Sequence, residues 1–102
     1  MADLGEPVGH EQGFQRPVLV VSVNEWNQRS RELVIVIPIT SRSQDWPTHI
    51  AIPTSAGLHV PSFGKVEDLR SISVRRLTRR LGSAPDAAMT DVDRVMRMLL
   101  GL

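Results

Sequence analysis

Two long apolar runs constrain the fold of this chain more than any other feature. The first, V-L-V-V-S-V, covers Val18 to Val23, and the second, L-V-I-V-I-P-I-T, covers Leu33 to Thr40. β-Branched residues favour strands, and a run that is almost continuously apolar is typical of a strand buried on both sides or set in a barrel wall. The polar stretch between the runs, Asn24 to Glu32, is predicted to be a loop.

Two further strands are predicted downstream. Thr48 to Ile52 alternates between polar and apolar residues and is closed by Pro53. Phe63 to Ile72 also alternates, which as a continuous strand places Lys65 and Glu67 on the same face.

The last quarter of the chain changes to helical spacing. The S-A-P-D segment that starts at Ser83 predicts a helix beginning with Ser83 as the N-cap. An apolar stripe follows and ends before Gly101; it consists of Met89, Val92, Val95, Met96 and Leu99. Strands followed by one amphipathic helix predict a mainly β fold with α, a small barrel or curved sheet packed on a C-terminal helix. We expect a single domain over residues 1–102.

Composition excludes several classes of protein. The chain has 102 residues, of which 41% are hydrophobic and 23% charged, as in a folded domain. No apolar run approaches the roughly 18 residues of a membrane span, and no signal peptide is recognised, so we expect a cytoplasmic protein. Without cysteine there is no disulfide, thiol catalysis or thiolate metal site. The three histidines lack metal-binding spacing; we expect them at the surface or on edge strands, and expect no metal or cofactor.

Arginine supplies eleven of the twelve basic residues. It binds phosphate through paired hydrogen bonds, which favours a phosphate-containing ligand, although a GC-rich genome also produces an arginine-rich surface. The arginine pairs at 75–76 and 79–80 are interpreted as solvated faces. Trp26 and Trp46 lie in predicted loops, where an indole can stack on a base, but capping of the core is the favoured interpretation.

Polar side chains gather where the first apolar run begins. Pro17 has a fixed φ and no backbone N–H, which suits the first position of a strand and places Arg16 at the rim of the sheet. The loop before it carries an imidazole, a carboxylate and an amide on His10, Glu11 and Gln12. This grouping is typical of an anion site and equally of an ordinary solvated loop.

Hydroxyl groups follow the second apolar run abruptly, at Thr40 and Ser41. If the two runs form neighbouring strands, these hydroxyls share a rim with Arg16 and could bind a phosphate. Local capping of the strand end by the hydroxyls is the alternative.

Four sequence blocks carry a family resemblance over nearly the whole chain. They are G-H-E-Q-G-x-x-R-P-V-L-V-V-S, V-I-V-I-P-I-T-S, G-L-x-x-P-S and L-R-S-I-S-x-x-R-L. With them the chain resembles the MazF/PemK/Kid toxins. The resemblance implies an SH3-like barrel of the MazF/CcdB type with a C-terminal helix. It also implies a homodimeric, metal-independent endoribonuclease that cuts single-stranded RNA and is paired with a MazE-like antitoxin.

The resemblance also implies roles for individual residues. It places the catalytic arginine on Arg16, the threonine of the family's P-x-T-S motif on Thr40 and the candidate catalytic carboxylates on Glu11 and Glu67. RNA binding is expected from five further positions: His10, Gln12, Ser41, Lys65 and Arg70. Asp68 stands where the family usually has glutamine, which puts a carboxylate near the expected RNA path.

The start of the chain departs from the family pattern. Members usually open with a strand of the R-G-D-I-W type, whereas this sequence opens M-A-D-L, so that strand is expected to be absent or nearly so. Either a start codon lies upstream, or a partner subunit completes the barrel; we favour the upstream start.

The implied chemistry is RNA transesterification by the substrate's own 2′-hydroxyl. Arg16 is the candidate for stabilising charge in the transition state, Glu11 or Glu67 the candidate base, and Thr40 the candidate contact to a phosphate oxygen. Two alternatives stay open: a CcdB-like toxin that acts on gyrase, and an inactive RNA-binding remnant.

Overall fold

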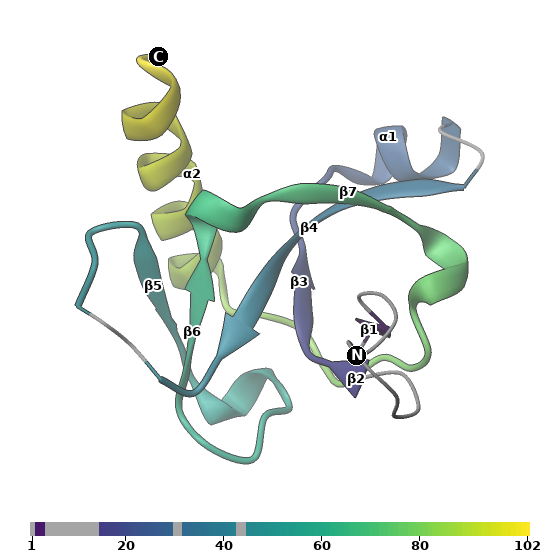
Figure 1. The fold of residues 1–102 in the computed structure, drawn as a ribbon, viewed down its shortest axis with the longest axis horizontal. Helices are drawn as coiled ribbons and strands as arrows, with labels where there is room; N and C mark the ends of the chain where they lie inside the picture. The colour runs from purple at the N-terminus through teal and green to yellow at the C-terminus, as the bar shows by residue number, and fades with distance from the viewer. Residues whose placement is uncertain (1, 4–14, 30–31, 43–44) are drawn as a thin grey trace, which may run out of the picture.

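The computed structural model describes residues 2–3, 15–29, 32–42 and 45–102 (Figure 1). The strands are β1 (Ala2–Asp3), β2 (Gln15–Arg16), β3 (Val18–Val20), β4 (Leu33–Thr40), β5 (His49–Ile52), β6 (Ser62–Lys65) and β7 (Arg70–Ser73). The helices are α1 (Asn24–Arg29) and α2 (Asp86–Leu100), and single 3-10 turns cover Thr54–Ala56, Val66–Asp68 and Val74–Arg76. None of the described helices has the length and apolar character that crossing a membrane requires.

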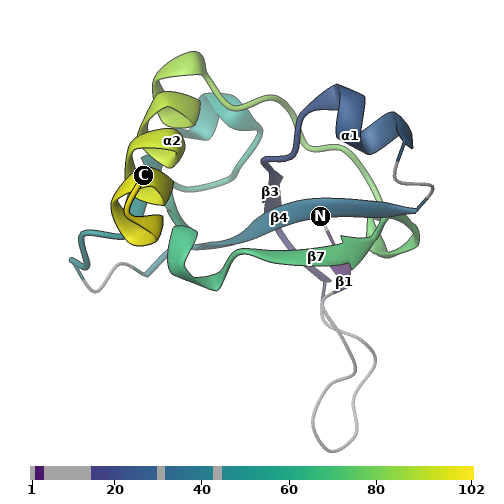
Figure 2. The ribbon, with the colours of Figure 1, turned by 90° about the horizontal axis from the view of Figure 1, so that it is seen from above.

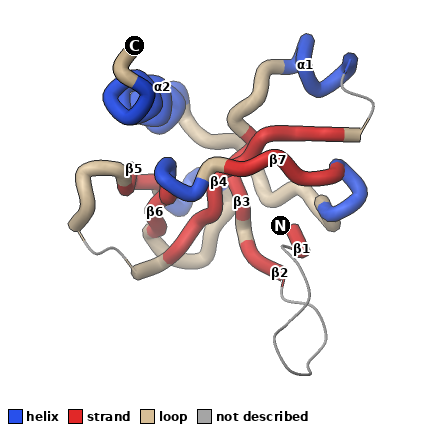
Figure 3. The backbone as a smooth tube through the Cα atoms, turned by 45° about the horizontal axis from the view of Figure 1, so that its top comes forward, coloured by secondary structure: helices blue, strands red, loops and turns tan. Residues whose placement is uncertain are grey.

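An antiparallel five-stranded sheet organises the molecule. Its order is β3-β4-β6-β5, and β7 pairs with β4 beside it. β4 is the central strand: its first half pairs with β7, its middle with β3 and its end with β6. α1 lies near the start of β4 and α2 near its far end, as Figures 2 and 3 show. The prediction of a mainly β fold with a C-terminal helix is confirmed.

The sheet buries apolar side chains on both faces. One cluster joins α2 to the sheet and includes Val92 and Val95 of the helix with Ile37, Ile50 and Ile52 of the strands. The other cluster is smaller and consists of Val34, Val36 and Ile72, with Val18, Val20 and Leu77 against it. Because neighbouring residues of a strand point to opposite faces, the near-continuous apolar run of β4 serves both clusters.

Gly64 is needed for close packing on the α2 side. A Cβ at this position would lie 2.8 Å from Ile37 Cδ1 and 3.2 Å from Ile52 Cδ1. Carbon atoms in ordinary contact are about 3.5–4.0 Å apart, so any larger residue would push these core side chains away.

The stretch predicted as a loop between the two apolar runs contains α1, so that prediction was wrong. The preceding strand is correspondingly shorter than predicted, since β3 ends at Val20. Side-chain hydrogen bonds account for both differences. The Ser22 hydroxyl donates to Asn27 Oδ1 and accepts from Ile35 N at 3.1 Å, while Asn27 Nδ2 donates to the Ser22 carbonyl at 3.2 Å. Val21 N and Ser22 N both donate to the Ile35 carbonyl, at 2.9 and 3.3 Å, so the regular ladder ends there, and the bonds between Ser22 and Asn27 fix the first turn of the helix.

The predicted strand from Phe63 to Ile72 is interrupted, which is a second correction. β6 stops at Lys65, the chain makes the 3-10 turn Val66–Asp68, and β7 begins at Arg70. The turn exists because Val66 is buried in the α2 cluster while its N–H donates to the Thr48 carbonyl at 3.2 Å. Simple alternation therefore does not place Lys65 and Glu67 on one face.

The C-terminal helix agrees with the predicted stripe but not with the predicted cap. α2 begins at Asp86 after Pro85, and Ser83 instead accepts a hydrogen bond from Arg80 Nη2 at 2.6 Å. Val92 and Val95 are buried, whereas Leu99 is 46% exposed, so the stripe leaves the core in the last turn. Gly101 ends the helix with φ of 70°, a conformation that favours glycine.

A short strand stands where the family's opening strand is expected. β1 has two residues and pairs antiparallel with β2, with Ala2 opposite Arg16.

Candidate functional site

The register of the strands brings several predicted site residues to one face of the sheet. Val18 pairs with Pro38, and Ile39 N donates to the Pro17 carbonyl at 3.1 Å, which continues the ladder toward Arg16 and Thr40. The predicted neighbourhood of the two apolar runs is thus confirmed. Pro17 itself lies between β2 and β3 rather than at the first position of a strand, a small correction.

The same row continues across the sheet. Thr40 pairs with Phe63, and Phe63 pairs with Ala51. In the next row His49 is opposite Lys65. The residues that alternate with these rows, such as Ile39 and Ile50, pack in the α2 cluster. The side chains of the two rows therefore point to the opposite face of the sheet from α2. We call the part of the sheet that carries Arg16, Thr40, Phe63, Lys65 and His49 the open face.

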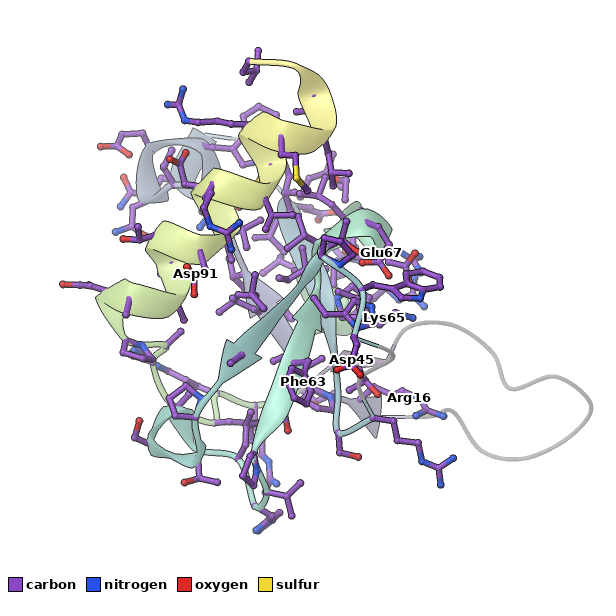
Figure 4. The ribbon with its side chains drawn as sticks, turned by 90° about the vertical axis from the view of Figure 1, so that its left-hand side faces the viewer. Arg16, Asp45, Phe63, Lys65, Glu67 and Asp91 are labelled. Carbon is purple, nitrogen blue, oxygen red and sulfur yellow. The ribbon has the colours of Figure 1, made fainter. Side chains whose placement is uncertain are left out.

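Figure 4 shows Arg16, Phe63, Lys65 and Glu67 along this side of the molecule, with Asp45 among them. Arg70 also belongs to this side, since it pairs with Val36 and shares the face of Ile72. Arg16, Ser41 and Arg70 are exposed, and Thr40, Lys65 and Glu67 are half-buried. His10, Glu11 and Gln12 lie outside the described residues.

The Thr40 hydroxyl makes hydrogen bonds within its own chain segment. Its Oγ1 accepts from Arg42 N at 3.1 Å and is 3.4 Å from the Arg42 carbonyl oxygen. The local cap considered for the strand end is thus present at Thr40, and it fixes the position of the hydroxyl beside Ser41.

Glu67 lies at the centre of a polar cluster at one end of the open face. Its Oε1 accepts from the Thr48 hydroxyl at 2.7 Å, and its Oε2 is 3.0 Å from His49 Nε2. Burial on its own raises the pKa of Glu67. Hydrogen bonds from Thr48, the Glu67 N–H and His49 outweigh it, so the pKa lies below its usual value. Glu67 is therefore an ionised acceptor with both oxygens engaged.

Lys65 forms an ion pair with Asp68, the residue that stands where the family usually has glutamine. Its Nζ lies 2.9 Å from Asp68 Oδ2 across the 3-10 turn. The hydrogen bond to Asp68 raises the pKa of Lys65, burial opposes the shift, and the charges of Asp68 and Glu67 add to it. Lys65 thus stays a cation, and Asp68 neutralises it on the open face.

His49 is a residue of the site that the sequence did not single out. β5 ends the strand order, so the expected edge-strand position is confirmed, but the side chain is only 4% exposed and is not a surface group. Its Nδ1 is buried without a hydrogen-bond partner in the described part of the chain. The Trp46 ring lies against the imidazole, with centroids 5.5 Å apart and planes 37° apart.

A cavity lies away from these residues. It has a volume of about 610 Å³ and is lined by β3, Ala56 and the segment 77–84 among others. Arg16, Thr40 and Glu67 do not line it. The candidate site is thus an exposed sheet face, a shape suited to an extended polymer rather than to an enclosed small molecule.

Comparison with known proteins identifies the class to which this fold and face belong. Residues 1–100 match the model of the PemK-like, MazF-like toxins of type II toxin-antitoxin systems, and the chain belongs to this family. The prediction made from the four sequence blocks is confirmed.

Individual relatives cover almost the whole chain. Endoribonuclease EndoA of Bacillus subtilis (strain 168) is 36% identical over 104 residues, which cover 99% of this chain and 89% of EndoA. Endoribonuclease MazF6 of Mycobacterium tuberculosis (strain ATCC 25618 / H37Rv) is 34% identical, with 99% and 91% covered.

The fold is that of solved MazF structures. The MazE-MazF crystal structure (Form-II) from Deinococcus radiodurans superposes with a TM-score of 0.83 at 29% identity, covering 99% of this chain and 89% of that chain. Mycobacterium tuberculosis toxin MazF-mt6 superposes with a TM-score of 0.78 at 22% identity, covering 89% of each chain.

Proposed function

We propose that the protein is the toxin of a type II toxin–antitoxin system. In this proposal it is an endoribonuclease that cleaves single-stranded RNA at specific sequences and thereby inhibits translation and growth in the cytoplasm. The carrying observation is the open face, where the cation of Arg16, the hydroxyl of Thr40 and the aromatic ring of Phe63 follow one another across the sheet. Phosphate contacts and a stacking surface are what a single strand needs.

The proposed reaction uses the 2′-hydroxyl of the substrate as nucleophile. Its oxygen attacks the adjacent phosphorus, the bond to the 5′ oxygen of the next nucleotide breaks, and a 2′,3′-cyclic phosphate remains. A base takes the 2′ proton, an acid protonates the leaving oxygen, and negative charge grows on the phosphate oxygens. We propose that the reaction needs no metal, because the nucleophile belongs to the substrate and a cationic side chain can stabilise the charge on the phosphate.

Arg16 has the role of stabilising that growing charge. Its guanidinium is permanently cationic and is carried by paired backbone at the end of β2, so little reorganisation accompanies the reaction. Thr40 lies across the ladder and, through its cap on Arg42, holds its hydroxyl where a phosphate oxygen can be bound. Arg70 provides further positive charge along the RNA, and Lys65 adds to it where a phosphate takes the place of Asp68 beside its ammonium group.

The two candidate bases are not equivalent. Both oxygens of Glu67 are engaged by Thr48 and His49, and its lowered pKa makes the carboxylate a weaker base. We therefore assign the general base to Glu11 and a positioning role to Glu67.

The expected partners follow from the relatives. Solved relatives include MazE-MazF complexes and an endoribonuclease with its cognate antitoxin. We propose a homodimer whose RNA-binding face is covered by a MazE-like antitoxin when the toxin is held inactive.

Incubation of the protein with a long RNA in the presence of EDTA, followed by mapping of the cut ends, tests this function. We expect cuts at one short sequence, ends carrying 2′,3′-cyclic phosphate, and no cleavage of an all-deoxy oligonucleotide. DNA breakage through gyrase, with RNA intact, would establish the CcdB-like alternative. Salt-dependent RNA binding without cleavage would establish the inactive remnant.

A further inference from the structure

An exposed indole stands at the edge of the open face. Trp46 is 51% exposed, although it sits against the nearly buried imidazole of His49. A tryptophan that served only to cap the core would bury most of its ring, because the ring carries a large apolar surface. The prediction that Trp46 caps the core was therefore wrong, because about half of its surface is exposed.

The backbone around the indole is fixed by a tight turn. His49 N donates to the Trp46 carbonyl at 3.0 Å, and Pro47 restricts φ between them. Asp45, immediately before, has a φ of 58°, a left-handed conformation that is uncommon outside glycine. The direction in which the indole leaves the chain is thus set locally.

A chain of contacts supports the ring from behind. The imidazole of His49 faces the indole and is held through Nε2 by Glu67, whose other oxygen is held by Thr48. Thr48 fixes the orientation of Glu67, and Glu67 fixes that of His49. The indole therefore packs against an imidazole of fixed orientation. Rigid, half-exposed aromatic rings are efficient stacking surfaces because little side-chain freedom is lost on binding.

The position of the indole relative to charge completes the argument. His49 pairs with Lys65 across the β5–β6 ladder, and Phe63 is the next residue of β6 on the same face. The imidazole beneath the indole is therefore adjacent to the Lys65–Asp68 ion pair and to the ring of Phe63, on the face that carries the cation of Arg16. Single-stranded nucleic acids are bound by this combination of charge and stacking.

We propose that Trp46 stacks on a base of the RNA substrate, and that His49 and Glu67 are positioning residues that hold the indole for it. This inference rests on the proposed function in that RNA is the ligand of the open face. It assigns part of the RNA affinity to a residue outside the proposed cleavage machinery.

The second tryptophan provides a matched control. Trp26 is 43% exposed and lies on α1, near the start of β4 and away from the β5–β6 end. The two indoles thus have similar exposure, but the ring pair found among the described residues involves Trp46 alone.

The experiment measures binding of uncleavable 2′-O-methyl RNA 12-mers of mixed sequence, so that it does not depend on catalysis. In Trp26→Phe protein the remaining emission reports Trp46, and in Trp46→Phe protein it reports Trp26. We expect the RNA to quench the first strongly and the second little. An abasic 12-mer with the same phosphates should quench neither, because stacking requires a base.

Affinity provides the second readout. We expect Trp46→Leu to weaken binding of the 2′-O-methyl RNA roughly 10-fold, within the range of one stacked base, and Trp26→Leu to leave it unchanged. Binding of the abasic 12-mer should not distinguish the two variants. His49→Ala should also weaken RNA binding, and His49→Phe, which restores a ring beneath the indole, should recover most of the loss.

Two results would overturn the proposal. One is a Trp46→Leu protein that binds RNA as the wild type does, with or without a lowered melting temperature. The other is equal loss of affinity for the normal and abasic 12-mers. The outcome is separate from the nuclease assay. Quenching of Trp46 by the 2′-O-methyl RNA, together with no cleavage of the long 2′-hydroxyl RNA in EDTA, would refute the endoribonuclease but keep the stacking residue. Cleavage of the long RNA, together with wild-type RNA affinity of Trp46→Leu, would keep the endoribonuclease but refute the stacking residue.

Discussion

The two faces of the sheet are made by the same strands but differ in what covers them. On the α2 side, Ile37, Ile50 and Ile52 are closed off by the helix, and Val95 is fully buried among them. On the open face, at the same end of the sheet, the alternate residues are Thr40, Lys65 and the others that define it. Alternation along a strand therefore separates a face that stabilises the fold from a face available to a ligand. The two faces should respond differently to substitution.

Substitution on the covered face should have the largest effect on stability. Val95→Asp would put an unpaired carboxylate into the α2 cluster, and an uncompensated buried charge costs on the order of 3–5 kcal/mol. We expect the urea midpoint, measured by circular dichroism, to fall far below that of the wild type. A variant that keeps its cooperative transition at the wild-type urea concentration would contradict the assigned core.

The polar cluster of Glu67 should matter to stability as well, although it lies on the open side. Glu67→Ala would leave Thr48 and the nearly buried His49 without their shared acceptor, a loss of about 1–3 kcal/mol. Urea denaturation at pH 7 measures this effect. Glu32→Ala is the control, because its ion pair with Arg75 is exposed and should contribute much less.

The same residue predicts a pH dependence. The pKa of Glu67 is lower in the folded than in the unfolded chain, so the unfolded state binds its proton more readily. The stabilisation is present above the usual glutamate pKa of 4.5 and is lost as the pH falls through the lowered folded value. The free energy of unfolding of Glu67→Gln should therefore fall less between pH 6 and pH 3 than that of the wild type. Parallel curves would exclude this contribution.

The smallest effect is expected from the ion pair on the open face. Asp68→Asn frees Lys65 for phosphate and removes a negative charge from the RNA path, so RNA affinity should rise a few-fold at low salt and less at high salt. Asp93→Asn, which breaks a similar pair with Arg97 on α2, should leave affinity unchanged. Binding by fluorescence anisotropy at two salt concentrations distinguishes them.

Much of this arrangement could be predicted from the sequence, because period and apolar content report directly on strands. The run from Leu33 to Thr40 is β4 over its full length, and the helical stripe with Gly101 is α2. α1 could not be predicted in this way, since it depends on the hydrogen bonds between Ser22 and Asn27 rather than on a periodic pattern.

The candidate site was predictable only in part, for a related reason. The register of β3 and β4 brings Arg16 toward Thr40, as the pairing of two adjacent apolar runs suggests. The contact of His49 with Glu67 joins residues 18 positions apart and depends on the turn after Lys65, which the alternating pattern conceals. A long-range polar contact leaves no local signature in a single sequence.

The central claim is that the open face cleaves RNA and that α2 does not. Its most direct test is the single-turnover rate at which Arg16→Ala and Arg97→Ala cleave a long RNA in EDTA, with the melting temperature measured on the same samples. Arg97 is an exposed arginine of α2, paired with Asp93 at 3.1 Å, and is the matched control. We predict a loss of roughly 100-fold for Arg16→Ala, the usual effect of removing one preorganised donor, and wild-type rates for Arg97→Ala, with both proteins folded. Equal cleavage rates for the two folded variants would contradict the claim.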